Sequence, residues 1–484
     1  MSRSLAIALG RPTFDLELAS EQVAAAESVL TGLGVPGADG MEIVTDIETL
    51  NARLESITDP PALVIVLQAT FTDASLVGRI ADRIDAPMLV WSFPEARTGG
   101  RLRLNSLCGA NLAAYLLRRR GVRVRFVHVD PTSPQAPELV GSEIDRAREA
   151  VGEVSSAGGQ STMGQGLGSE VPVRVAGFAG RRIGVVGEPP AGFEPCEGDP
   201  DELRRITGIE VDRVPLGDLF AAADGVDAVA RLATSQRVLS TMDVDDDVRE
   251  AGMDRSIGLY GGLAALAEQH RWSAVATRCW PECMTEYGGA MCTPMAMLTE
   301  DGVPGVCEAD LYGAVTALIL EHISGTDPFI ADLVDADTAD ETSVVWHCGV
   351  ASPGLADPSE RPVGITHPNR HRALANQFAL RPGRVTLARL SQSANEITMV
   401  VGGGEILRRP RPFQGTCGVL RWDRPIGDVM STVFDRGLEH HLGIVYGEHR
   451  DALTALAAQW HVPVVELGGS DRRGRRASGG RRVS

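Results

Sequence analysis

Lysine is absent from this sequence of 484 residues, and all 46 basic side chains are arginines. Catalysis through a lysine Schiff base is therefore excluded, which removes pyridoxal phosphate chemistry and the imine route for cleaving or isomerising sugars. The lysine of a phosphate-binding P-loop is missing as well. Carbonyl chemistry in this protein must depend on a metal ion or on acid–base catalysis alone.

Long apolar runs are absent too, and the N-terminal segment MSRSLAIALGRP is too short in apolar residues for a signal-peptide core. We therefore expect a cytoplasmic protein without a membrane partner. A net charge of -18 disfavours nucleic acid as a partner, because nucleic acid is itself a polyanion. The eight cysteines form no C-x-x-C pair, so we expect buried thiols.

Short apolar runs such as ALVIVL alternate with helical patterns in the first part of the chain and again after RRIGVVG. Such alternation is typical of parallel sheets with helices on both faces. Later segments such as RVTLARL and EITMVVGGGEI are strand-like and lack long helices between them. The predicted fold class is α/β, with two doubly wound parallel-sheet domains followed by a β-rich, barrel-like C-terminal domain.

The predicted boundaries follow these changes of pattern. A Gly-, Ser- and Gln-rich stretch at 155–170 predicts a mobile loop. The last residues contain six arginines and one aspartate, which predicts a disordered basic tail. We place an N-terminal domain at 1–175, a central domain at 176–340, a β-rich domain at 341–470 and the tail at 471–484.

Two carboxylates stand out as candidate metal ligands and proton carriers. Glu308 lies in the apolar run GVCEA, and Asp332 lies in PFIADL, where an acid is costly to bury without a compensating charge. Asp310 is a competitor for Glu308. If both lie at the start of one helix, residues two apart diverge by about 200° and only one faces the site. The apolar setting favours Glu308, and a charge at a helix N-terminus is the alternative reading of either acid.

Two histidine positions complete the candidate set. His347 follows the apolar run SVVW and either ends a buried strand facing a cleft or is a core residue. His440 and His441 precede the strand-like LGIVY, and strand alternation predicts that only one of them faces the site. Two carboxylates with imidazoles suit Mn²⁺ or another borderline divalent metal better than Ca²⁺ or structural zinc.

Several ordered motifs, among them RCWPECMTEYGGAMC, GVPGVCEADLYGAVT, WHCG and EHHLGIVYGEHRDAL, resemble those of the L-fucose isomerase and L-arabinose isomerase superfamily. The resemblance runs from about residue 60 to 465. It implies an aldose–ketose isomerase that binds a small sugar and a Mn²⁺-type ion, and a homo-oligomer, either trimer or hexamer. It further implies that Glu308 and Asp332 bind the metal and move protons, with His441 and His347 as imidazole ligands.

An enzyme of this kind converts an aldose into a ketose through an enediolate that the metal holds. Three alternatives remain open: a neutral aldose, a modified or anionic sugar held by arginines that line the pocket, and a non-catalytic sugar-binding protein of the same fold. Trp91, in the motif WSFPEARTGG, is a candidate sugar-stacking residue, with core packing as its alternative role.

Overall fold

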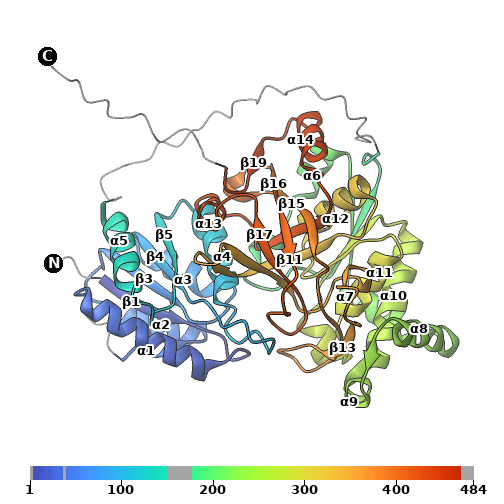
Figure 1. The fold of residues 1–484 in the computed structure, drawn as a ribbon, viewed down its shortest axis with the longest axis horizontal. Helices are drawn as coiled ribbons and strands as arrows, with labels where there is room; N and C mark the ends of the chain where they lie inside the picture. Colours follow the sequence, from blue (N-terminus) through green and yellow to red (C-terminus); the bar gives the residue numbers. More distant parts are fainter. Residues whose placement is uncertain (1–3, 36–39, 150–176, 470–484) are drawn as a thin grey trace.

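A computed structural model describes residues 4–35, 40–149 and 177–469 of the protein (Figure 1). The predicted mobile loop at 155–170 and the predicted tail at 471–484 lie outside these residues. The three parts of the described chain are two parallel sheets with helices and one barrel, which confirms the predicted fold class. No helix within the described ranges is long and apolar enough to cross a membrane.

The N-terminal sheet is entirely parallel, with the strand order β2-β1-β3-β4-β5. Every residue of β3 is buried, as expected for a strand covered on both faces. The strands are β1 (Ser4–Leu9), β2 (Ile43–Val44), β3 (Leu63–Gln68), β4 (Met88–Ser92) and β5 (Val124–His128). The helices are α1 (Leu16–Gly32), α2 (Ile47–Glu55), α3 (Ser75–Arg83), α4 (Ser106–Arg119) and α5 (Ala136–Glu149).

The central sheet is also parallel, with the strand order β10-β9-β6-β7. Its strands are β6 (Arg182–Val186), β7 (Glu210–Val214), β9 (Ala274–Thr277) and β10 (Gly305–Val306). Its longer helices are α6 (Pro200–Thr207), α7 (Leu216–Asp224), α8 (Ala228–Thr241), α10 (Asp254–His270), α11 (Cys292–Glu300) and α12 (Leu311–Ser324). Helix α12 is apolar on all sides because it packs between this sheet and the barrel.

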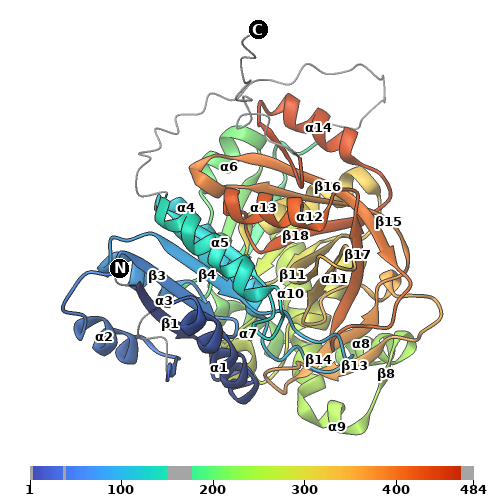
Figure 2. The same cartoon turned by 60° about the vertical axis from the view of Figure 1, so that its left-hand side comes forward.

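Six antiparallel strands close the C-terminal barrel, because β16 pairs with both β15 and β17. They are β11 (Phe329–Asp337), β12 (Thr342–His347), β15 (Gly383–Ser391), β16 (Thr398–Leu407), β17 (Thr416–Trp422) and β18 (His441–Tyr446). Further strands extend the sheet: β8 (Asp243–Val244), β13 (Val363–Thr366), β14 (Ala373–Ala379) and β19 (Val464–Glu466). Helices α13 (Ile426–Arg436) and α14 (Arg450–Gln459) flank the barrel (Figure 2).

Candidate active site

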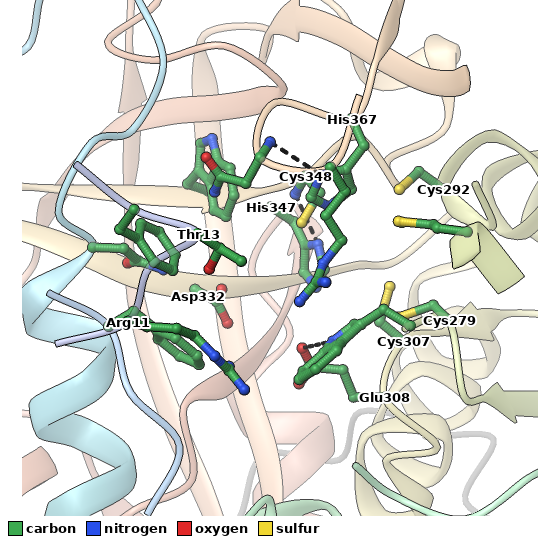
Figure 3. Close-up of a pocket in the computed structure, with 18 of the residues that line it drawn as sticks. Arg11, Thr13, Cys279, Cys292, Cys307, Glu308, Asp332, His347, Cys348 and His367 are labelled. Carbon is green, nitrogen blue, oxygen red and sulfur yellow. Dashed lines mark hydrogen bonds between the residues drawn. The ribbon is translucent and has the colours of Figure 1, made fainter. Parts of the chain in front are cut away.

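One cavity is lined by all three parts of the chain (Figure 3). Arg11, which follows β1, comes from the N-terminal domain, and Glu308 comes from the loop after β10. Asp332 and His347 come from barrel strands β11 and β12. Figure 3 shows these side chains pointing toward a common space, with thiols along one wall. The eight cysteines are all free, and seven of them are buried, as expected.

Glu308 lies in a tight loop at the carboxyl end of the central parallel sheet, where ligands of such sheets usually bind. The prediction that it begins a helix is wrong, because α12 begins at Leu311 with Asp310 as its N-cap. Glu308 and Ala309 have left-handed backbone conformations, with φ values of 64° and 54°. Such strain in residues other than glycine costs free energy and is concentrated at functional sites.

Asp332 and His441 face each other across neighbouring antiparallel barrel strands, because β11 pairs with β18 in that register. Directly opposed residues present their side chains on the same face of a sheet. The His441 Nε2 atom lies 3.6 Å from Asp332 Oδ1 and 3.7 Å from Glu308 Oε2. The His441 Nε2 atom is therefore close to both predicted carboxylates.

His441 belongs to two overlapping groups of residues that could each hold a divalent cation, one with Glu308 and one with Asp332. His441 Nε2 and Asp332 Oδ1 are both buried and have no hydrogen-bond partner among the described residues. Their separations are too long for strong hydrogen bonds, and ligand atoms about 2.0–2.2 Å from a shared ion lie roughly 3–4 Å apart. The residues therefore offer oxygen and nitrogen donors in the arrangement that a borderline metal prefers. In each group the potential ligand atoms all lie within 4.8 Å of one another: Asp332, His347 and His441 form one group, and Cys196, Glu308, His440 and His441 form the other.

His441 is oriented by a buried ion pair that the sequence analysis did not identify. Its Nδ1–H donates to Asp310 Oδ2 at 2.7 Å, which leaves the Nε2 lone pair for a cation. Asp310 in turn accepts two bonds from the Arg389 guanidinium, at 2.5 and 2.9 Å, and both side chains are almost fully buried. Glu308 lines the cavity and Asp310 does not, so only one of the two acids faces it, although both contact the His441 ring.

His440 also faces the site, contrary to the prediction from strand alternation. Its Nε2 lies 3.0 Å from Glu308 Oε2, and its ring centroid is 4.0 Å from that of His441. The alternation fails because β18 begins at His441, so His440 is outside the regular strand. His347 ends β12, and its Nδ1 accepts the backbone N–H of Cys348 at 2.8 Å. A neutral His347 ring therefore carries its proton on Nε2 and is a hydrogen-bond donor in this arrangement.

The two carboxylates are held in different charge environments. Burial raises the pKa of Asp332 to about 7, although the charge of His441 opposes this shift. Burial also disfavours the charged form of Glu308, but the hydrogen bond from His440 and the nearby histidines lower its pKa to about 2. Burial opposes the charged form of His441, yet the bond to Asp310 and the surrounding acids raise its pKa to about 9. The site thus favours positive charge at the position of His441 Nε2.

Residues 6–146 match the model of a family described as fucose/sulfoquinovose isomerase, N-terminal domain. A sulfoquinovose isomerase of Alkalicoccus urumqiensis is 29% identical over 467 residues, which cover 96% of this chain and 99% of that protein. Proteins of the same name from Priestia megaterium and Clostridium sp. are each 28% identical and match 93% of this chain. The chain matches this family model and these relatives, which supports a place in a fucose-isomerase-like superfamily. It is accordingly an isomerase, as the ordered motifs predicted.

Trp91 of this isomerase does not line the cavity. It is fully buried in the core of the N-terminal domain, and its indole N–H donates to the Val129 carbonyl oxygen at 2.9 Å. Its ring packs edge-on against Phe93. This position corresponds to the core-packing alternative, and the sugar-stacking role is not supported by where the side chain lies.

Sequence reasoning missed the role of Arg389, although a signal for it was present. The run RVTLARL places an arginine inside an apolar strand, and such a charge requires a buried partner. It also missed Trp280, whose indole N–H donates to Glu308 Oε1 at 3.2 Å. Nothing local in the sequence connects Trp280 with Glu308, because they lie on separate loops of the central domain.

Proposed function

We propose that this isomerase converts an anionic, sulfonated aldose of the sulfoquinovose type into the corresponding ketose with the aid of a bound divalent metal. The observation that carries the proposal is the cluster around His441 Nε2, where two carboxylates and one imidazole meet in a buried cavity. Support for the substrate class comes from the relatives named sulfoquinovose isomerase, which match the chain over almost its whole length. Sulfoquinovose is a hexose that carries a sulfonate on its terminal carbon.

Glu308, Asp332 and His441 would hold the metal, with Mn²⁺ as the favoured ion. When bound, such an ion polarises the sugar carbonyl and makes the neighbouring C–H more acidic. The carboxylates of Glu308 and Asp332, both in the cavity wall, supply the negative charge for this cation.

Isomerisation moves one proton from C2 to C1 and another from the C2 hydroxyl to the oxygen on C1. Both oxygens of Glu308 are contacted by donors, Trp280 Nε1 at 3.2 Å and His440 Nε2 at 3.0 Å. Asp332 Oδ1 has no such partner among the described residues. We therefore assign the carbon-bound proton to Asp332 and the proton between the two oxygens to Glu308. In this proposal His347, which lines the cavity, donates a hydrogen bond from its Nε2–H to a sugar oxygen.

The test is incubation of the purified protein and Mn²⁺ with sulfoquinovose and with a panel of neutral aldoses that includes L-fucose and L-arabinose. We expect ketose from sulfoquinovose, and none from the Asp332→Asn variant. Conversion of neutral aldoses alone would support the proposed isomerase reaction and overturn the proposed substrate class. Conversion of no aldose would contradict the proposed reaction.

A further inference from the structure

Two guanidinium groups pack against one indole ring in the wall of the active-site cavity. The Arg370 guanidinium carbon lies 4.5 Å from the centroid of the Trp280 ring, and that of Arg11 lies 5.1 Å from it. All three residues line the cavity. Arg11 follows β1, and Arg370 belongs to the loop between β13 and β14, so the pair is assembled from distant segments.

No acid forms a direct ion pair with Arg370 among the described residues. Its guanidinium forms no hydrogen bond or ion pair with any described residue, whereas Arg11 is 3.0 Å from Asp73. Burial lowers the pKa of Arg370, and the nearby positive charge of Arg11 lowers it further. A half-buried cation beside a second cation is unfavourable without an anion to share. The cavity therefore has a guanidinium without a direct anionic partner on the side of the Trp280 ring.

Trp280 also connects this cationic region to the reacting carboxylates, because its Nε1 donates to Glu308 Oε1. An open-chain sugar with its carbonyl end at Glu308 and Asp332 therefore extends along the indole toward the two arginines. The end of the sugar remote from the carbonyl is the end that carries the sulfonate in sulfoquinovose. Figure 3 shows the Arg11 guanidinium reaching into the cavity.

We propose that Arg370, assisted by Arg11, which packs against the same Trp280 ring, is the subsite that binds the sulfonate of the substrate. The inference rests on the proposed function and names the residues that give it its specificity. A guanidinium presents a rigid fork of N–H donors that matches the oxygens of a sulfonate, as it matches a phosphate. Stacking on Trp280 holds this fork in place and lowers the entropy lost on binding.

A simpler role for Arg370 is to stabilise the charge of Glu308, since these two groups attract each other through space. The two roles make different predictions. A sulfonate-binding arginine discriminates between a sulfonated sugar and its neutral counterpart. An arginine that acts on Glu308 affects both sugars equally, because both need the same proton transfers.

The experiment compares sulfoquinovose with quinovose, its neutral 6-deoxy counterpart, in the wild type and in Arg370→Met and Arg370→Lys. The control is Arg381→Met, because Arg381 stacks on Tyr446 at 4.2 Å but does not line the cavity. We expect kcat/KM for sulfoquinovose to fall about 10- to 100-fold in Arg370→Met, the scale of losing a hydrogen bond to a charged group. Activity on quinovose should change by less than about threefold, and Arg370→Lys should recover part of the loss.

An equal loss on both sugars, or no loss on either, would overturn the sulfonate subsite. Direct binding separates this result from failure of the proposed function. We would titrate sulfoquinovose by calorimetry into the Asp332→Asn variant with and without Arg370→Met. An affinity for sulfoquinovose that is at least tenfold weaker after Arg370→Met supports the subsite, even if no isomerisation is observed. The subsite is refuted if Arg370→Met leaves the affinity for sulfoquinovose unchanged, or if the Asp332→Asn variant that retains Arg370 does not bind sulfoquinovose.

Discussion

Replacement of Asp310 by asparagine should weaken both the fold and metal binding, although Asp310 does not line the cavity. Its carboxylate accepts two bonds from Arg389, one from His441 Nδ1 and one from the backbone N–H of Gly313. Asparagine is also a good N-cap residue, so the start of α12 should survive. What is lost is the negative charge between Arg389 and His441.

The stability loss follows from the burial of Arg389, which is 1% exposed. A buried charge left without its partner costs about 3–5 kcal/mol. Glu439 also attracts Arg389, so we expect a value near the lower end. Urea denaturation of the metal-free protein measures this loss. Asp357→Asn is the control, because Asp357 is also buried and paired with an arginine, Arg408, which is exposed; its loss should be clearly smaller.

The effect on metal affinity comes from His441. A carboxylate on the remote nitrogen of a ligating imidazole fixes the ring and raises its basicity, and its removal typically costs about 10- to 100-fold in affinity. Calorimetric titration with Mn²⁺ should show this loss in Asp310→Asn and none in Asp357→Asn. The double variant with Arg389→Met should regain much of the stability but not the affinity. Wild-type Mn²⁺ affinity in Asp310→Asn would refute the role assigned to this pair.

Four further outcomes are expected. Glu308→Gln and Asp332→Asn should each lower turnover at least about 100-fold while thermal unfolding remains cooperative; a smaller loss would reassign the proton carriers. Chelation should abolish activity, and Mn²⁺ should restore it and add about 2.7 kcal/mol of stability at 100 times its Kd; full activity after chelation would exclude the metal. Asp335→Asn should lower the stability of the protein, because it removes the ion pair of Asp335 with Arg97, 2.7 Å away. Burial raises the pKa of Asp335, but contacts with His128 and Arg97 lower it below 3.8 overall, so this stabilisation is complete above about pH 4 and is lost as the pH falls through the folded-state pKa. A variant that differs most from the wild type in acid would contradict this sign. Sugar deuterated at C2 should lose label to water over repeated turnovers, and quantitative transfer of label to C1 would indicate a hydride shift instead.

The layers of the fold were predictable because each leaves a local pattern. The strand Leu63–Gln68 is a continuous apolar run, and the apolar helix Leu311–Ser324 ends at a left-handed glycine, Gly325. The closure of the barrel was not specified in this way. It depends on the pairing of β16 with β17, and no pattern within either strand determines which strand its free edge contacts. The sequence therefore indicated a β-rich, barrel-like domain without showing which strands close it.

The candidate site was predictable where acids and histidines interrupt apolar runs, as at Asp332 and His441. Burial of a polar group is costly, and such a position implies a partner or a ligand. The sequence could not show which partners meet. Arg370 and Trp280 are ordinary residues of loops, and only the folded chain places the guanidinium over the indole. Specificity for the substrate is therefore harder to predict than the chemistry of the reacting groups.

The pair Glu308 and Asp310 shows why regular spacing failed at the centre of the site. Two residues apart on a helix, they would face different directions, but the left-handed conformations of Glu308 and Ala309 turn the chain before α12 begins. As a result one acid lies near each nitrogen of His441: Glu308 near Nε2, and Asp310 bonded to Nδ1. Each left-handed residue costs about 1–2 kcal/mol, and contacts such as the buried Asp310–Arg389 pair help to hold this strained backbone. The departure from helical periodicity is thus what allows one short segment to supply both a cavity carboxylate and the group that orients the imidazole.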